Sequence, residues 1–158
     1  MKSKVIVIGI GNEFRQDDGV GIHIARGLAA RRAGRTRERK LDGVCVAEYQ
    51  GAGADLMERW QGYETVVLFD AVSSAGTPGT IHRFVIPADT LPRESFFWST
   101  HAVSLGQTIE LAKTLKRLPR KLIIYGIEGK SFDHGSGISP QVKDAAQRLV
   151  EEFISCMR

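Results

Sequence analysis

Residues Val5–Ala25 read VIVIGIGNEFRQDDGVGIHIA. The apolar run Val5–Ile8 is typical of a buried strand, and the glycine turn at Gly9–Asn12 ends it. Two adjacent carboxylates, Asp17 and Asp18, follow before a helical pattern begins. This order places the acidic pair at the carboxyl end of a first strand, where open α/β sheets bind their ligands.

The length and composition are those of a single globular domain. A chain of 158 residues is long enough to bury a sizeable core, so we expect one domain over residues 1–158. No apolar run approaches the roughly 20 residues of a membrane-spanning helix. Met1–Lys4 leads into a strand without the apolar region of a secretory signal, and two cysteines, Cys45 and Cys156, are too few for a disulfide framework. We therefore expect a cytoplasmic protein that has no membrane partner and whose thiols are buried or incidental.

The net charge of +4 comes from one segment. Arg31–Lys40, RRAGRTRERK, contains six basic residues and one glutamate, and the rest of the chain is close to neutral. No aromatic residues alternate with these charges, so the segment is typical of a solvated helix end and loop. We expect no nucleic-acid partner, and a docking patch for an acidic protein stays open as the alternative.

Apolar patterns predict the element order βαβαββαβα. The turn-rich segment 73–79 is too short for a crossover between parallel strands, so the fourth strand is expected to run antiparallel, as in a hairpin with the third. This gives an α/β three-layer sandwich: a five-stranded, mostly parallel twisted sheet with one antiparallel strand and helices on both faces. The expected strands are 5–8, 44–47, 65–69, 80–85 and 121–128, and the expected helices are 18–32, 54–60, 100–115 and 140–153.

Three residues occupy places where a ligand could bind. Asp18 follows the first strand, Asp70 ends the third, and His101 opens a helix after the aromatic loop Phe96–Trp98. The first and third strands are commonly neighbours at the switch point, so the two carboxylates are expected to face each other. Two carboxylates and an imidazole suit Zn²⁺ or Ni²⁺ and leave coordination positions open. The alternative is that Asp70 caps a turn and His101 caps a helix.

A dinucleotide site is the competing interpretation of the first turn. Gly9 and Gly11 fit the start of a dinucleotide fingerprint, but Phe14 stands where the third glycine belongs. Two carboxylates would also repel a pyrophosphate at a helix N-terminus, so a cation is favoured. One aspartate can cap the following helix, and we assign this role to Asp17, with the orientation of a water molecule as the alternative.

The segment Gly9–Gly21 resembles the opening signature of the hydrogenase maturation endopeptidases. The resemblance continues through Phe69–Ala71, Ser99–His101, Tyr125–Glu128 and Ser139–Pro140, and it covers nearly the whole chain in the family's order and spacing. It implies an endopeptidase that removes a C-terminal extension from the precursor of the large subunit of a nickel–iron hydrogenase. In the family this cleavage follows nickel insertion and lets the active site close.

The resemblance also implies which residues act. It makes Asp18, Asp70 and His101 the metal-contacting and catalytic residues, and the metal the substrate's own nickel, with zinc or cadmium as other possible occupants. The implied partner is the hydrogenase precursor, and we expect a monomer. The chain departs from the family at Gln50, where many members have an aspartate proposed to act in catalysis, because a glutamine cannot be a general base.

Two hypotheses from other classes stay open at this point. A non-proteolytic nickel-state sensor or chaperone of the same precursor would use the same three residues, and the mass of the precursor would distinguish it from a peptidase. A nucleotide-dependent oxidoreductase would instead use the glycine turn, and titration with dinucleotides would detect it. The aromatic loop Phe96–Trp98 is either a patch for a protein substrate or part of the core.

Overall fold

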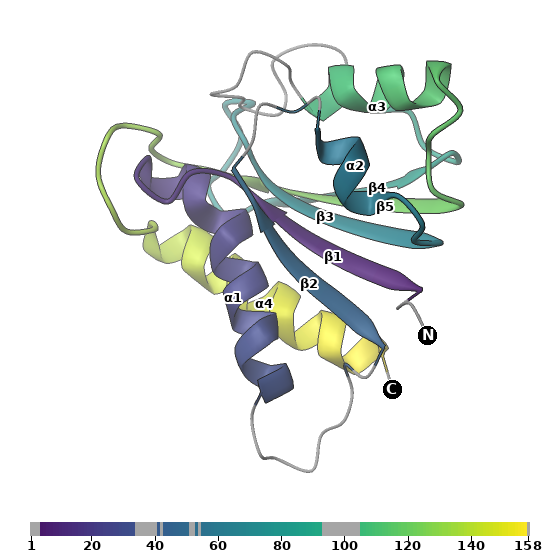
Figure 1. Ribbon diagram of the computed structural model, residues 1–158. Helices are drawn as coiled ribbons and strands as arrows, with labels where there is room; N and C mark the ends of the chain where they lie inside the picture. The colour runs from purple at the N-terminus through teal and green to yellow at the C-terminus, as the bar shows by residue number, and fades with distance from the viewer. Residues whose placement is uncertain are drawn as a thin grey trace.

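The computed structural model describes residues 4–33, 41, 43–50, 53, 55–92 and 105–157. A five-stranded sheet lies between two pairs of helices, which confirms the predicted fold class (Figure 1). The strands are β1 (Val5–Ile10), β2 (Val44–Tyr49), β3 (Thr65–Val72), β4 (Ile81–Ile86) and β5 (Lys121–Glu128). The helices are the 3₁₀ turn η1 (Gln16–Gly19), α1 (Val20–Ala33), α2 (Leu56–Trp60), α3 (Leu105–Thr114) and α4 (Pro140–Cys156).

The strands lie in the order β2-β1-β3-β5-β4, and only β4 is antiparallel to its neighbour. The predicted direction of β4 is therefore confirmed, but the predicted hairpin with β3 is wrong, because β4 pairs with β5. The sequences of the two strands explain this arrangement. Leu122, Ile124 and Ile127 of β5 are completely buried, whereas most of β4 is only half-buried. A strand that is apolar on both faces belongs in the centre, and β4 belongs at the edge.

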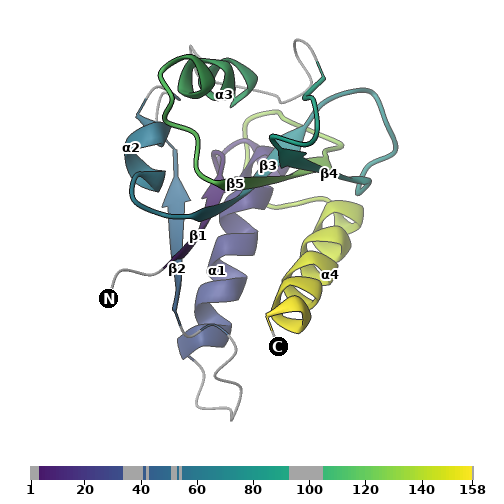
Figure 2. The ribbon, with the colours of Figure 1, turned by 90° about the vertical axis from the view of Figure 1, so that its right-hand side faces the viewer.

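Side chains alternate across the sheet and form two apolar layers. Figure 2 shows α1 and α4 on one side of the sheet and α2 and α3 on the other. Completely buried side chains in each layer fix these helices to the strands. Representative members on the α1–α4 side are Val7, Val67, Leu28 and Val142, and on the α2–α3 side they are Ile8, Leu68, Leu56 and Ala112.

Glycines bring the start of α1 against the carboxyl ends of two strands. A methyl group at Gly21 would lie 2.3 Å from the carbonyl oxygens of both Ile10 and Phe69. Gly11 has φ +150°, and a methyl group there would lie 1.9 Å from the carbonyl oxygen of Asp18. Such short distances exclude a side chain at either position. The two glycines therefore set how closely Asp18 approaches β1 and β3.

The outer edge of the sheet is closed near the end of β4. The backbone N–H of Val85 donates to Asp89 Oδ2 at 2.6 Å, and the carbonyl oxygen of Val85 accepts the N–H of Asp89 at 2.7 Å. These bonds occupy the backbone groups of Val85 that point away from β5.

Two further features of the fold concern membrane-spanning helices and thiols. In the described ranges, no helix combines the length and apolar character needed to span a bilayer. Both cysteines are free thiols: Cys45 is half-buried in β2, and Cys156 is exposed at the end of α4.

Candidate functional site

Two carboxylates are buried together at the carboxyl edge of the parallel strands. The Asp18 side chain is 2% exposed and the Asp70 side chain 5% exposed. Asp18 comes from η1, the next element after β1, and Asp70 from β3, the strand beside β1. The backbone N–H of Asn12 donates to Asp18 Oδ2 at 3.1 Å, and the N–H of Ala71 donates to Asp70 Oδ1 at 2.8 Å. The structure thus brings together two of the three predicted site residues.

The two carboxylates repel each other electrostatically. Burial raises the pKa of Asp70 well above its ordinary value of 3.8, and the negative charge of Asp18 raises it further, against a smaller opposite effect of the Ala71 N–H. A cation between two such groups would remove both the repulsion and the unfavourable burial of charge. Oxygen donors of this kind suit divalent metal ions.

Asp70 lies within its strand, whereas the sequence predicted that it ends the strand. β3 continues through Val72, and Asp70 lies opposite Gly126 of β5 in the parallel register. A glycine at the paired position leaves the space beside the Asp70 carboxylate free of a second side chain. By the alternation of the strand, Asp70 lies on the same face as Leu68 and Val72, which is the face that α3 covers.

The third predicted ligand, His101, lies outside the described residues, as do the aromatic loop Phe96–Trp98 and residues 34–40 of the basic segment. Within the described ranges, no group of three His, Cys, Asp or Glu side chains is arranged to hold a metal ion. Asp18 and Asp70 therefore supply two oxygen donors, and His101 as the third ligand stays a prediction.

The expected role of Asp17 as a helix cap is wrong. Its side chain is completely buried, and its hydrogen bonds in the described part of the chain all go to residues 130–139 and none to the start of α1. Its Oδ2 accepts hydrogen bonds from the N–H groups of Lys130 and Ser131 at 2.8 and 3.0 Å and from the Ser139 hydroxyl at 2.6 Å, while Oδ1 accepts the Ser139 N–H at 2.7 Å. Because η1 turns this side chain toward the loop before α4, Asp17 fixes that loop instead.

The electrostatics of Asp17 are opposite to those of Asp70. Burial alone raises the pKa of Asp17, but the hydrogen bonds from Ser139, Lys130 and Ser131 outweigh it and lower the pKa below 3.8. Asp17 is therefore a stable anion, with three hydrogen bonds to Oδ2 and one to Oδ1.

Glu128 is a buried carboxylate at the same edge that sequence reasoning missed as an organising residue. Its side chain is 1% exposed at the end of β5 and accepts the N–H and hydroxyl of Ser74 at 2.7 and 2.6 Å and the N–H of Gly76 at 3.2 Å. His82 of β4 lies 3.3 Å from its Oε2. Glu128 therefore holds the turn between β3 and β4. The sequence signal that could have found this residue is a single acid at the end of an apolar strand.

The carboxyl end of β2 is fixed by Tyr49. Its hydroxyl accepts the N–H of Gly53 at 3.0 Å and donates to Asp55, and burial together with that carboxylate raises the pKa of Tyr49 to about 12. Gln50, the position where the chain departs from the family, follows directly and is exposed. A neutral amide therefore stands at the end of β2.

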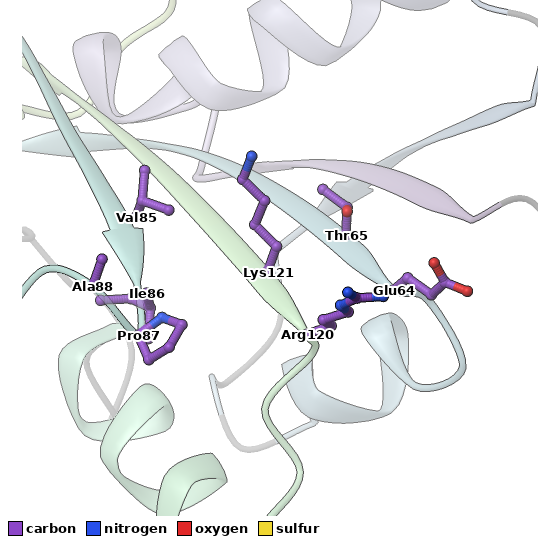
Figure 3. A pocket seen from close by; sticks show the side chains of 8 residues that line it. All are labelled: Glu64, Thr65, Val85, Ile86, Pro87, Ala88, Arg120 and Lys121. Carbon is purple, nitrogen blue, oxygen red and sulfur yellow. The ribbon is translucent and has the colours of Figure 1, made fainter.

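A separate pocket of about 520 Å³ lies at the opposite end of the sheet (Figure 3). Thr65 and Lys121 line it at the amino ends of β3 and β5, and Pro87 lines it just after β4. The amino ends of parallel strands are far from their carboxyl ends. This pocket is therefore not part of the Asp18–Asp70 site, and we assign it no function.

Comparisons with known proteins show which family this chain resembles. A family model described as hydrogenase maturation protease matches residues 22–156. The hydrogenase expression/formation protein HupD of Thiocapsa roseopersicina is 29% identical over 154 residues, which cover 94% of this chain and 65% of that protein. The hydrogenase 2 maturation protease of Escherichia coli (strain K12) is 23% identical over 159 residues, which cover 98% of this chain and 91% of that protein. The chain thus spans about two thirds of the length of the first relative.

A solved structure shares the fold. The hydrogenase maturating endopeptidase HybD of E. coli superposes with a TM-score of 0.71 at 19% identity, covering 98% of this chain and 92% of that one. At this identity the likeness supports the fold alone, whereas the family model covers most of the chain. The chain belongs to the hydrogenase maturation protease family.

Proposed function

We propose that this protein is an endopeptidase that removes a C-terminal extension from the nickel-loaded precursor of a nickel–iron hydrogenase large subunit. The observation that carries the proposal is the buried Asp18–Asp70 pair, because two carboxylates in mutual repulsion form a site that is completed by a cation. Family membership supplies the class of reaction and of substrate.

In this proposal the metal arrives with the substrate. Asp18 and Asp70 contact nickel that the precursor already holds through its own ligands, so the carboxylates distinguish loaded from unloaded precursor. Zinc or cadmium could occupy the same oxygens in the free protein. Without a cation, the charged form of Asp70 is unfavourable, because burial and the negative charge of Asp18 raise its pKa.

His101 is proposed as the third contact. Asp70 lies on the face of the sheet that α3 covers, and His101 precedes the first residue of α3 by four positions. An imidazole from this segment would add a nitrogen donor to two oxygen donors, a set suited to Ni²⁺ or Zn²⁺. Cleavage then requires a water molecule that attacks the scissile carbonyl while the metal polarises or positions it.

A processing assay tests this proposal. The protein is incubated with nickel-loaded and with nickel-free precursor, and the mass of the large subunit is measured over time. We expect shortening of the loaded precursor only, and at least a hundredfold slower shortening with Asp18→Asn, Asp70→Asn or His101→Ala. Asp133→Asn, at an exposed position, is the matched control and should process at the parental rate.

Two results would decide against parts of the proposal. Full-rate processing by Asp18→Asn or Asp70→Asn would remove the carboxylate pair from the mechanism. Tight binding of the loaded precursor by the unmodified protein without any change in its mass would identify a nickel-state sensor or chaperone instead of a peptidase.

A further inference from the structure

Phe14 is exposed on a loop whose backbone is held in place. Its side chain is 66% exposed, more than any other large apolar side chain in the described part of the chain. Its N–H donates to Asn12 Oδ1 at 3.0 Å, and its carbonyl oxygen accepts the N–H of Gly135 at 2.9 Å. The neighbouring Arg15 side chain donates to the carbonyl oxygen of Phe132 at 3.1 and 3.2 Å. A fixed backbone lowers the entropy cost of using this ring in a contact.

The same loop reaches the carboxylate site. Asn12 donates its backbone N–H to Asp18 Oδ2 at 3.1 Å while its side chain accepts the N–H of Phe14. Two residues span at most about 7 Å, so the Cα atom of Phe14 lies within about 7 Å of that of Asn12, whose N–H contacts Asp18. A protein that presents a segment to these carboxylates therefore comes within reach of the Phe14 ring.

A pocket of about 390 Å³ adjoins this loop, and its lining includes three basic residues and one carboxylate, which are His23, Arg26, Lys143 and Glu13. Gln16 lines it from the loop, His23 from α1 and Lys143 from the first turns of α4, over an apolar floor that includes Ile22. Burial and the positive charges of Lys143 and Arg26 lower the pKa of His23, as expected where basic groups converge.

The charges in this pocket are unevenly paired. The Arg26 guanidinium is bound by Glu13 at 2.7 Å and by Glu48 at 2.9 Å. Lys143 and His23 have no ion-pair or hydrogen-bond partner for their side chains among residues 4–33, 41, 43–50, 53, 55–92 and 105–157. The pocket therefore offers an ammonium group, an imidazole and the Gln16 amide to an anionic group that enters from outside.

We propose that Phe14 and this pocket form the docking surface for the folded body of the hydrogenase precursor. The Phe14 ring inserts into an apolar depression of the precursor, and an aspartate or glutamate side chain of the precursor enters the pocket beside Lys143. Exposed aromatic anchors beside charged groups are typical of the residues that dominate binding energy. This inference rests on the proposed function, and it adds the residues by which the precursor is held while its extension reaches the carboxylates.

The test compares Phe14→Ala and Lys143→Glu with two matched controls on α3, Leu111→Ala and Lys113→Glu. Leu111 is 41% exposed and Lys113 is exposed, so each control makes the same kind of change on another surface. Steady-state processing of the nickel-loaded precursor should show a KM raised about tenfold by either test substitution, with kcat within about twofold of the parent. Both controls should leave KM unchanged. Added salt should raise the KM of the parent more than that of Lys143→Glu.

A nickel-free precursor that lacks its C-terminal extension serves as the second ligand, in calorimetry. If the docking surface binds the body of the precursor, Phe14→Ala and Lys143→Glu should raise the Kd for this shortened form as much as for the full precursor. An unchanged Kd for the shortened form would show that the surface binds the extension itself, and this would overturn the inference. A fall in kcat at unchanged KM would overturn it as well.

Calorimetry with nickel-free precursor separates this inference from the proposed function. The Kd for nickel-free precursor should rise about tenfold with Phe14→Ala or with Lys143→Glu, and not with the controls. Equal Kd values for all variants would overturn the docking surface alone. Failure of the unmodified protein to shorten nickel-loaded precursor would instead overturn the proposed function, whatever the Kd values.

Discussion

Asp17 accepts two hydrogen bonds from Ser139, one from the backbone N–H to Oδ1 at 2.7 Å and one from the hydroxyl to Oδ2 at 2.6 Å. The two residues are 122 positions apart. Ser139 directly precedes Pro140, the first residue of α4, so this contact joins the turn after β1 to the start of the last helix. Asp17 therefore fixes the loop beside the candidate site, while its neighbour Asp18 lies in the site.

Loss of the Asp17 carboxylate should destabilise the protein strongly. Asp17→Ala leaves the N–H groups of Lys130, Ser131 and Ser139 and one hydroxyl without their acceptor in a buried place. We expect the free energy of unfolding to fall by about 3 kcal/mol or more, measured by urea denaturation. Asp133→Ala, at an exposed position of the same loop, should change it by less than about 0.5 kcal/mol. A loss for Asp17→Ala as small as this control would contradict the assignment.

The stabilisation by Asp17 should depend on pH. The native pKa is lowered, so the unfolded chain binds this proton more readily than the native protein does. The stabilisation is complete above the ordinary pKa of 3.8 and is lost as the pH falls through the lower native pKa. The difference in unfolding free energy between the parent and Asp17→Asn should therefore be constant from pH 7 to 5 and shrink below about pH 4. A constant difference down to pH 2 would show that charge has no part in it.

The contribution of Asp70 to stability should depend on pH in the opposite direction to that of Asp17. Its native pKa is raised, so the native state holds the proton more tightly than the unfolded chain, and its destabilising effect appears as the pH rises above 3.8 through the native pKa. Asp70→Asn keeps an oxygen for the Ala71 N–H and removes the repulsion with Asp18. At pH 7 this substitution should stabilise the protein by about 1 kcal/mol in urea denaturation while it abolishes processing. The gain should vanish near pH 3, and a destabilised Asp70→Asn at pH 7 would contradict the assigned electrostatics.

The two glycines of α1 should respond differently to alanine. At Gly21 the added methyl group would lie 2.3 Å from the carbonyl oxygens of Ile10 and Phe69, so α1 would have to move away from the sheet. Gly21→Ala should cost about 3 kcal/mol or more of unfolding free energy and impair processing, because Asp18 moves with the helix. At Gly27 the nearest atom would be Cγ2 of Val150 at 3.3 Å, a side-chain contact that can adjust. Gly27→Ala should stay within about 1 kcal/mol of the parent in thermal denaturation.

Local patterns in the sequence were sufficient to predict most of the elements. β5 occupies 121–128 as predicted, because an uninterrupted apolar run has to be buried on both faces. Pro140 begins α4 as predicted, because proline suits the first position of a helix. Asp18 and Asp70 come together because the neighbouring parallel strands β1 and β3 place their carboxyl ends at one edge of the sheet.

Interactions between distant parts of the chain could not be predicted in this way. The acceptor role of Asp17 depends on residues 130–139, and no periodicity near Asp17 refers to them. The pairing of β4 with β5 likewise depends on which strand fills the place beside β3, which is decided by competition between apolar faces. The role of Glu128 could not be predicted from local sequence either, because its partners Ser74 and Gly76 lie more than 50 positions earlier in the chain.

The bonds between Val85 and Asp89 also affect how the protein behaves at high concentration. β4 is an edge strand, and a row of unpaired backbone groups is a template on which a strand of another molecule can assemble. Asp89 occupies both outward groups of Val85, and its carboxylate adds a negative charge at the place where an incoming strand would have to align. An incoming strand therefore cannot pair with Val85 unless it first displaces Asp89 from both backbone groups.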